Sequence, residues 1–251
     1  MKTILFLSLL SWRRLLAFQT PFIKHHHCRV SRALWVLSSQ PTISELSTDS
    51  FMKQVSHSEQ IVSELDKDIE SSEQDPQVQE RLTAMLSHAD GIRGFFVTYL
   101  TAVSTPADRG ENVPSSLLYA MQQANPDDLI PLACMNVVMP TAMITMHTDK
   151  ELSRQSRLTA ERGLKVLGAL LNDQQFSSAD VVREHCKAIL NATGDGASSD
   201  GTTETNGKAV LDSTTNTNPH LEYWTDFLRK WGYQGLQKRD IAQAMRSALL
   251  I

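Results

Sequence analysis

Residues 129–146, LIPLACMNVVMPTAMITM, decide the fold of this chain. The stretch contains no charged residue, and its polar side chains are those of Asn136, Thr141 and Thr145. A segment that is apolar all round must be buried on all sides, in a protein core or in lipid. Asn125 and Pro126 precede it and are typical of a helix start. We therefore predict an all-α helical bundle around one apolar central helix at about 126–147.

The same stretch carries two features that bear on this helix. Pro131 and Pro140 lie within it, and an internal proline lacks an N–H donor and clashes with the carbonyl four residues back. We therefore expect a kink or break near Pro140. The stretch also has about the minimum length of a membrane span. A membrane-embedded helix stays open as an alternative, although no Trp/Tyr belt or Lys/Arg-rich flank accompanies the stretch.

The regions on either side show apolar residues at the spacing of amphipathic helices. The clearest pattern occupies positions i, i+3, i+4, i+7, i+8 and i+11, filled by Ile92, Phe95, Phe96, Tyr99, Leu100 and Val103. Asp90 is expected to cap this helix, and Asp75 with Pro76 to open the helix before it. Further helices are predicted at about 114–124, 149–171 and 177–191. A capping-box pattern at 148–151 opens the second of these.

The first 40 residues differ in composition from the rest of the chain. They contain six Lys/Arg and no acidic residue, and an apolar run, ILFLSLL, follows Lys2. Ala17 and Phe18 come after this signal-like segment, and a basic, serine-containing tract continues to Ser39. This arrangement resembles the two-part presequence of plastid proteins in algae with complex plastids. The resemblance implies a plastid location, with a secretory signal and a mitochondrial presequence as alternatives.

Composition divides the remaining chain into four parts. Residues 41–74 are polar and partly helical, with an amphipathic helix expected at about 48–71, and residues 75–192 form the helical core domain. Residues 193–218, rich in Gly, Ser, Thr and Asn, bury too little apolar area to fold and are predicted to be a disordered linker. Residues 219–251 are predicted to be a C-terminal helical hairpin, which either packs on the core or forms a tethered interaction module.

Charge and cysteine content narrow the classes of function. Beyond residue 40 the chain holds 18 basic and 28 acidic residues, a net charge of −10. This acidic body argues against nucleic-acid binding, which needs Lys and Arg to neutralise phosphates. Cys28, Cys134 and Cys186 are far apart and predict neither a disulfide framework nor a metal site.

Motifs for chemistry are weak, and we predict no catalytic residue, cofactor or metal site. Gly91 and Gly94 lack the third glycine of a dinucleotide loop, and no GK[ST] phosphate-binding signature occurs. A His beside a carboxylate at the edge of a core can move protons, and the candidates for a pocket of this kind between residues 91–104 and the central helix are Asp90, Arg93, Tyr99 and His147. For Asp90 and His147 the simpler interpretation is a role at helix ends.

The leading hypothesis is therefore a non-enzymatic protein-interaction or assembly factor with an unidentified protein partner. Its candidate interaction residues lie on the aromatic face of the hairpin and are Trp224, Phe227, Leu228 and Trp231. Two alternatives stay open. One is a small-ligand-binding protein or enzyme that uses the pocket described above, and the other is a plastid membrane-associated protein held by the apolar stretch.

Overall fold

A computed structural model describes residues 40–71, 75–109, 112–194 and 218–250. Within these ranges there are ten α-helices, one short 3-10 helix and no strand, which confirms the predicted all-α fold. From Pro41 onward the described residues form one compact unit. The helices are α2 (Ile43–Thr48), α3 (Phe51–Ser71), α4 (Pro76–Met85), α5 (Ala89–Thr101), η1 (Pro106–Asp108), α6 (Ser115–Gln123), α7 (Pro126–Met146), α8 (Lys150–Asn172), α9 (Ala179–Thr193), α10 (Pro219–Trp231) and α11 (Gly235–Leu250).

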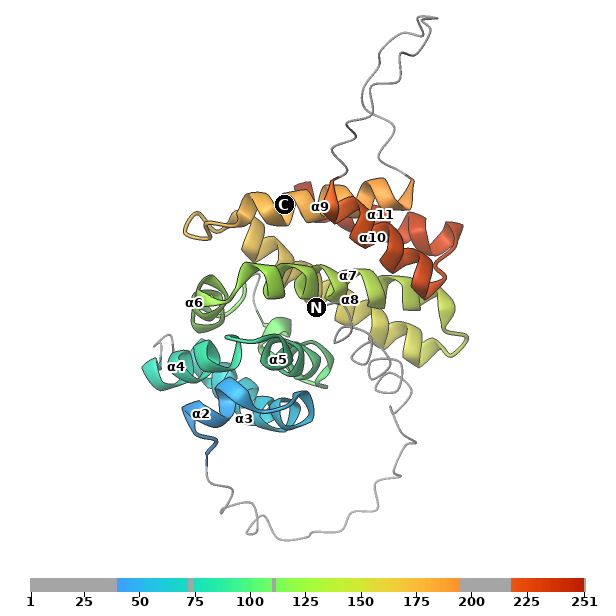
Figure 1. Ribbon diagram of the computed structural model, residues 1–251. Coiled ribbons are helices and arrows are strands. Elements are labelled where there is room, and N and C mark those ends of the chain that lie inside the picture. The colour runs from blue at the N-terminus through green and yellow to red at the C-terminus, as the bar shows by residue number, and fades with distance from the viewer. Residues whose placement is uncertain (1–39, 72–74, 110–111, 195–217, 251) are drawn as a thin grey trace, which may run out of the picture. The chain divides into compact units, whose positions relative to one another are not determined.

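Helix α7 is the predicted central helix. It begins where the sequence indicates, because Asn125 Oδ1 accepts from the Asp127 N–H at 3.1 Å and Pro126 occupies the first turn. It contacts α5, α8, α9 and α11 (Figure 1), so helices cover it from several sides. Among the described residues it is the one helix long and apolar enough to cross a membrane, and most of its apolar stretch is buried inside the protein. This burial is what a core helix requires.

The break expected near Pro140 does not occur, and α7 continues as one helix through both prolines. Pro140 has no N–H to donate to the Asn136 carbonyl four residues back. Gly163 of α8 lies against that carbonyl, so closely that a Cβ at this glycine would stand 2.7 Å from the Asn136 oxygen. The close approach brings Gly163 Cα–H groups to an oxygen that its own helix leaves without a donor, a weak but recurrent contact between packed helices.

The N-terminal helices show one correct and one wrong cap prediction. Asp75 Oδ1 accepts from the Gln77 N–H at 2.8 Å, as expected for the start of α4. Asp90 does not cap α5, because His88 occupies that position and its Nδ1 accepts from the Gly91 N–H. Asp90 Oδ2 instead accepts from the Phe51 N–H at 3.3 Å and so satisfies the first turn of α3. Asp90, in the first turn of its own helix, therefore accepts a hydrogen bond from the start of another helix, 39 residues earlier in the chain.

Helices α2 and α3 are part of the core, although the composition of this region is polar. Leu46 of α2 and Ile61 and Leu65 of α3 have no exposed surface.

Asp149 is the N-cap of α8, and its Oδ1 accepts from the N–H groups of Glu151 and Leu152. The capping box predicted at 148–151 is not formed, because Asp149 and not Thr148 is the N-cap and Glu151 pairs with Arg154.

The C-terminal hairpin packs on the core, which decides between the two arrangements left open by the sequence. Helix α10 lies along α9, and α11 lies against α7 and α9. Trp224 is fully buried and its Nε1 donates to His185 Nδ1 at 3.1 Å. Glycines with positive φ end two helices, Gly194 at 87° for α9 and Gly232 at 68° for α10, a conformation that glycine commonly adopts at helix C-termini.

Two predictions fall on segments outside the described residues. The targeting presequence and its His25, His26, His27 and Cys28 lie within 1–39, and nearly all of the predicted disordered linker lies within 195–217.

Candidate functional site: a groove between α3 and α5

A groove of about 490 Å³ opens between α3 and the C-terminal half of α5, with η1 at one end. Its lining combines small apolar side chains, hydroxyls and two carboxylates. The residues are Val55, Glu59, Val62, Ser63 and Asp66 of α3, Val97, Thr98 and Thr101 of α5, and Ala102, Ser104 and Pro106 of the following loop.

The two helices that form the groove approach each other at Gly94. A Cβ at this position would lie 2.6 Å from Gln54 Cβ, so only glycine allows the observed separation. One turn further on, Thr98 Oγ1 donates to the Val55 carbonyl of α3 and to its own Gly94 carbonyl, both at 3.3 Å. The helices are therefore tightly joined at the N-terminal half of α5, and the groove begins where this contact ends.

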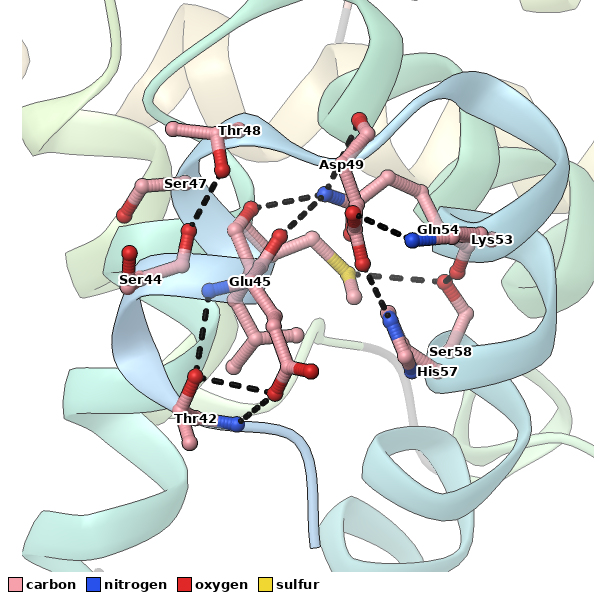
Figure 2. Close-up of polar contacts among 12 residues, drawn as sticks. Thr42, Ser44, Glu45, Ser47, Thr48, Asp49, Lys53, Gln54, His57 and Ser58 are labelled. Atoms are coloured by element: carbon pink, nitrogen blue, oxygen red, sulfur yellow. Dashed lines mark hydrogen bonds and ion pairs between the residues drawn. The ribbon is translucent and has the colours of Figure 1, made fainter.

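The start of α3 is fixed by a buried polar cluster (Figure 2). Gln54 is fully buried, and its Nε2 donates to the Leu46 carbonyl at 2.8 Å and lies 3.3 Å from those of Glu45 and Asp49. The Leu46 carbonyl lies in the last turn of α2, where carbonyls lack an intrahelical donor, whereas the Glu45 carbonyl also accepts from the Asp49 N–H. Gln54 thus ties the short helix α2 to α3, and with Asp90 it holds the first turn of the groove helix in place.

Two basic side chains of α3 add to this cluster. His57 Nε2 and Lys53 Nζ each lie 3.0 Å from a carboxylate oxygen of Asp49, and the pair holds the pKa of Asp49 below its usual value. The groove helix is anchored at this end by hydrogen bonds as well as by apolar packing.

The wall at the other end of the groove is held by α8. Arg162 is buried and donates through Nε and Nη2 to the carboxylate of Asp108, at 2.8 and 2.6 Å. Its Nη1 donates to the Leu100 and Ala102 carbonyls at the end of α5, at 2.8 and 2.9 Å. Lys165 Nζ donates to the Ala107 carbonyl at 2.9 Å. The Arg162 guanidinium therefore donates to carbonyls at the end of α5 and also holds η1, whose Pro106 lines the groove.

The charged groups in the groove are both acidic. Glu59 is exposed, and Asp66 Oδ2 accepts from Arg109 Nη2 at 2.7 Å. The other oxygen of Asp66, Oδ1, accepts no hydrogen bond from the part of the chain that the structure describes. This oxygen is itself buried, so a further donor reaches it only when neighbouring side chains move.

Beside the groove the loop presents a fully exposed apolar side chain, that of Val103. The sequence pattern placed Val103 in the apolar stripe of the preceding helix, but α5 ends at Thr101 and the chain turns away. An exposed valine next to a partly apolar groove extends the apolar surface that a partner can cover.

The predicted pocket residues do not come together in this groove. Tyr99 is fully buried, its hydroxyl receives no hydrogen bond from the described residues, and burial raises its pKa. Asp90 pairs with Arg93 at 3.0 Å, and the Arg93 guanidinium lies over the Phe51 ring, 4.7 Å from its centre. His147 ends α7 as its C-cap. None of the four lines the groove.

The hairpin residues proposed for interaction serve another purpose. Trp224, Phe227 and Leu228 are buried, and Trp231 is partly exposed. We correct the prediction that this face is an external binding surface, because its buried side chains attach the hairpin to the core. His185, which accepts from Trp224, also contacts His220, with the two rings tilted by 41° and their centres 4.1 Å apart. Burial, with a smaller effect of His220, lowers the pKa of His185 to about 4.

No group of three or more His, Cys, Asp or Glu side chains close enough to hold a metal occurs among the described residues. Cys134 and Cys186 are both buried free thiols. The neighbouring Cys186 thiol and burial together raise the pKa of Cys134.

Sequence reasoning missed the groove, although part of its signal was visible. Val55, Glu59, Val62 and Asp66 stand at i, i+4, i+7 and i+11, so they share one face of α3. This face mixes two valines with two carboxylates, and the pattern is hidden by the stronger apolar stripe that α3 buries. The contribution of η1 could not be found in this way, because it depends on Arg162 more than 50 residues later.

Comparison with known proteins places the chain in a family. A family model described as uncharacterised conserved protein UCP020893 matches residues 50–200. The chain belongs to this family. The matched range runs from α3 to α9 and includes every lining residue of the groove, whereas α10 and α11 lie beyond it. The searches of curated proteins and of solved structures returned no match.

Proposed function

We propose that this protein is a non-enzymatic protein-interaction or assembly factor and that it binds its partner through the groove between α3 and α5. The observation that carries the proposal is the groove itself, bordered by the fully exposed Val103. Most of the other apolar side chains of α5 and α7 are buried, and Met146 at the end of α7 is exposed.

The construction of the groove supports a binding role. Each wall is held by buried polar contacts, Gln54 at the start of α3 and Arg162 at the end of α5. A rigid, preformed surface loses little conformational entropy on association, which favours affinity. Val55, Val62 and Val97 supply apolar surface to the floor and walls, and the hydroxyls and carboxylates among them supply orientation.

The test is a matched pair of surface substitutions in the full-length protein. Thr101→Arg places a long charged side chain at an exposed groove position, and Met52→Arg does the same at an exposed position of α3 that does not line the groove. A partner recovered with the wild-type protein is expected to be lost with Thr101→Arg and kept with Met52→Arg. Equal recovery with both variants, in purified reconstitution, overturns the proposal.

We further propose that the protein acts in a plastid, on the resemblance of residues 1–40 to a two-part plastid presequence. A fluorescent protein fused after residue 40 is expected to accumulate in plastids of an alga with complex plastids. Secretion of the fusion, or its import into mitochondria, contradicts this location and leaves the groove proposal unaffected.

A further inference from the structure

We infer that the partner segment is an amphipathic helix that presents small apolar side chains to the groove and Lys or Arg side chains to Glu59 and Asp66. The inference rests on the proposed function, because it specifies the chemistry of the partner that occupies the groove.

The shape of the groove favours a helix. Its lining residues on α3 stand at i, i+4, i+7, i+8 and i+11, that is at Val55, Glu59, Val62, Ser63 and Asp66. Eleven residues of helix extend about 16 Å. The opposite wall comes from the C-terminal half of α5 and the loop after it. A third helix of about three turns can lie along this groove and insert its anchors, the helix-in-groove arrangement in which anchors recur at i, i+3 or i+4 and i+7.

The apolar part of the lining sets the size of the anchors. Its members are Val55, Val62, Val97, Ala102 and Pro106, all small or medium in size. Val103 stands fully exposed beside them, where it can contact the flank of a bound helix. Such a surface suits Ala, Val or Leu anchors on the partner.

The charges select the polar face of the partner. The groove is lined by two carboxylates and no basic residue, and α3 as a whole carries two lysines against five acidic residues. Asp66 retains an oxygen that accepts no hydrogen bond from a described residue, although Arg109 pairs with its other oxygen. A Lys or Arg of the partner can donate to that oxygen once the side chains adjust, and another can pair with the exposed Glu59. Like-charged partners are repelled at the same two points.

The experiment compares two synthetic helical peptides against the full-length protein by fluorescence anisotropy. Both peptides carry Ala, Val and Leu anchors at i, i+4 and i+7, and they differ only in having two lysines or two glutamates at the flanking positions. Exposed ion pairs each change affinity by a factor of about two to five. The lysine peptide is therefore expected to bind about tenfold more tightly than the glutamate peptide in low salt, with a smaller ratio as salt rises.

The double variant Glu59→Gln/Asp66→Asn identifies the groups responsible. It is expected to bring the two peptides to within about twofold of each other, whereas Glu161→Gln, an exposed position of α8, leaves the tenfold ratio intact. Thermal unfolding of each variant checks that the fold is kept. Absence of binding by both peptides, equal binding of both, or a ratio that survives in the double variant overturns the inference.

The outcome is separable from that of the proposed function. Loss of the native partner with Thr101→Arg together with no charge preference between the peptides removes the inference and keeps the groove as the binding site. Retention of the native partner with Thr101→Arg removes both.

Discussion

The two helix pairs α7–α8 and α3–α5 both pack closely at a glycine, but they differ in how far other helices cover them. In each pair a glycine allows close approach, Gly163 against Asn136 in the first and Gly94 against Gln54 in the second. The first pair is covered further by α11 and α9, and α7 is buried along most of its length. The second pair borders a groove beyond Gly94.

The difference shows where this fold has surface available for binding. Most apolar residues of α7 are buried against neighbouring helices, and α11 of the C-terminal hairpin is one of the helices that cover them. On α3 one face is buried and the other mixes valines with carboxylates that remain accessible. Glycine-mediated contact gives both pairs rigidity, and incomplete coverage gives one of them a binding surface.

Breaking the link between the two pairs has the largest expected effect. Arg162 belongs to α8 and reaches Asp108 and the end of α5. Arg162→Met leaves the Asp108 carboxylate and two carbonyls without this donor and is expected to lower the free energy of unfolding by about 3 kcal/mol. Denaturant unfolding measures the change. Arg154→Ala removes an exposed pair with Glu151 on the same helix and serves as control, at about 0.5 kcal/mol or less. Equal effects would show that Arg162 does not hold the wall.

Alanine at the two glycines compares the closed and the open pair directly. Alanine gains about 1 kcal/mol of helix propensity over glycine, and overpacking opposes this by about 1–3 kcal/mol. At Gly163 the added Cβ meets the Asn136 carbonyl of an enclosed helix, so a net loss of about 2 kcal/mol is expected. At Gly94 the added Cβ meets Gln54 Cβ and the backbone of Val55 at a helix start that Gln54 and Asp90 anchor, so a net loss of the same size, about 2 kcal/mol, is expected. Denaturant unfolding of both variants measures the losses, and a loss at only one of the two glycines contradicts the shared role of the close approaches.

The junction of the hairpin with the core predicts a dependence on pH. The pKa of His185 is lowered to about 4 in the folded protein, against about 6.5 in an unfolded chain. Between these values the unfolded state binds a proton that the folded state excludes, so stability falls as pH decreases from 6.5 to 4. The neighbouring groups are His220, whose ring contacts that of His185, and Asp127, whose charge opposes the shift. The loss is expected to be about 2 kcal/mol after allowance for solvent screening.

Substitution separates His185 from the other titrating groups. His185→Gln retains an acceptor for Trp224 Nε1 but not the ionisation, and it is expected to flatten the pH dependence of the unfolding midpoint in this range. His147→Gln, at the C-cap of α7, is the control and should keep the wild-type slope. An unchanged slope in His185→Gln assigns the dependence to other groups.

Local signals predicted a large part of this fold. Asn125 with Pro126, Asp75 with Pro76, and the terminal Gly194 and Gly232 act on the turns beside them, so their positions can be interpreted from the sequence. The central helix was also correctly placed, because an uncharged stretch has few alternatives to burial.

Predictions that depended on contacts between residues far apart in the sequence were less accurate. Asp90 serves the first turn of α3, and Pro140 is accommodated next to Gly163 of a later helix, and no local pattern contains either partner. Trp224 and Phe227 have the same helical spacing whether they cover a core or await a partner. The groove likewise depends on how α3, α5 and the loop after α5 pack together. Its carboxylates at Glu59 and Asp66 are visible in the sequence only as ordinary surface charges.

The smallest effect on stability is expected at Val103, which lies beside the groove of the α3–α5 pair. Its side chain is fully exposed, so Val103→Ser should change the free energy of unfolding by no more than about 0.5 kcal/mol. If a partner covers it, its burial contributes to the complex about 1.5 kcal/mol or more, and the affinity for the partner should fall about tenfold. Met52→Ser is the control, since Met52 is also exposed and apolar but lies outside the groove. Anisotropy titration with the partner measures the affinity of both variants, and denaturant unfolding measures their stability. An apolar residue that matters for binding and not for folding marks a functional surface, and an unchanged affinity in Val103→Ser would confine the interface to the groove floor.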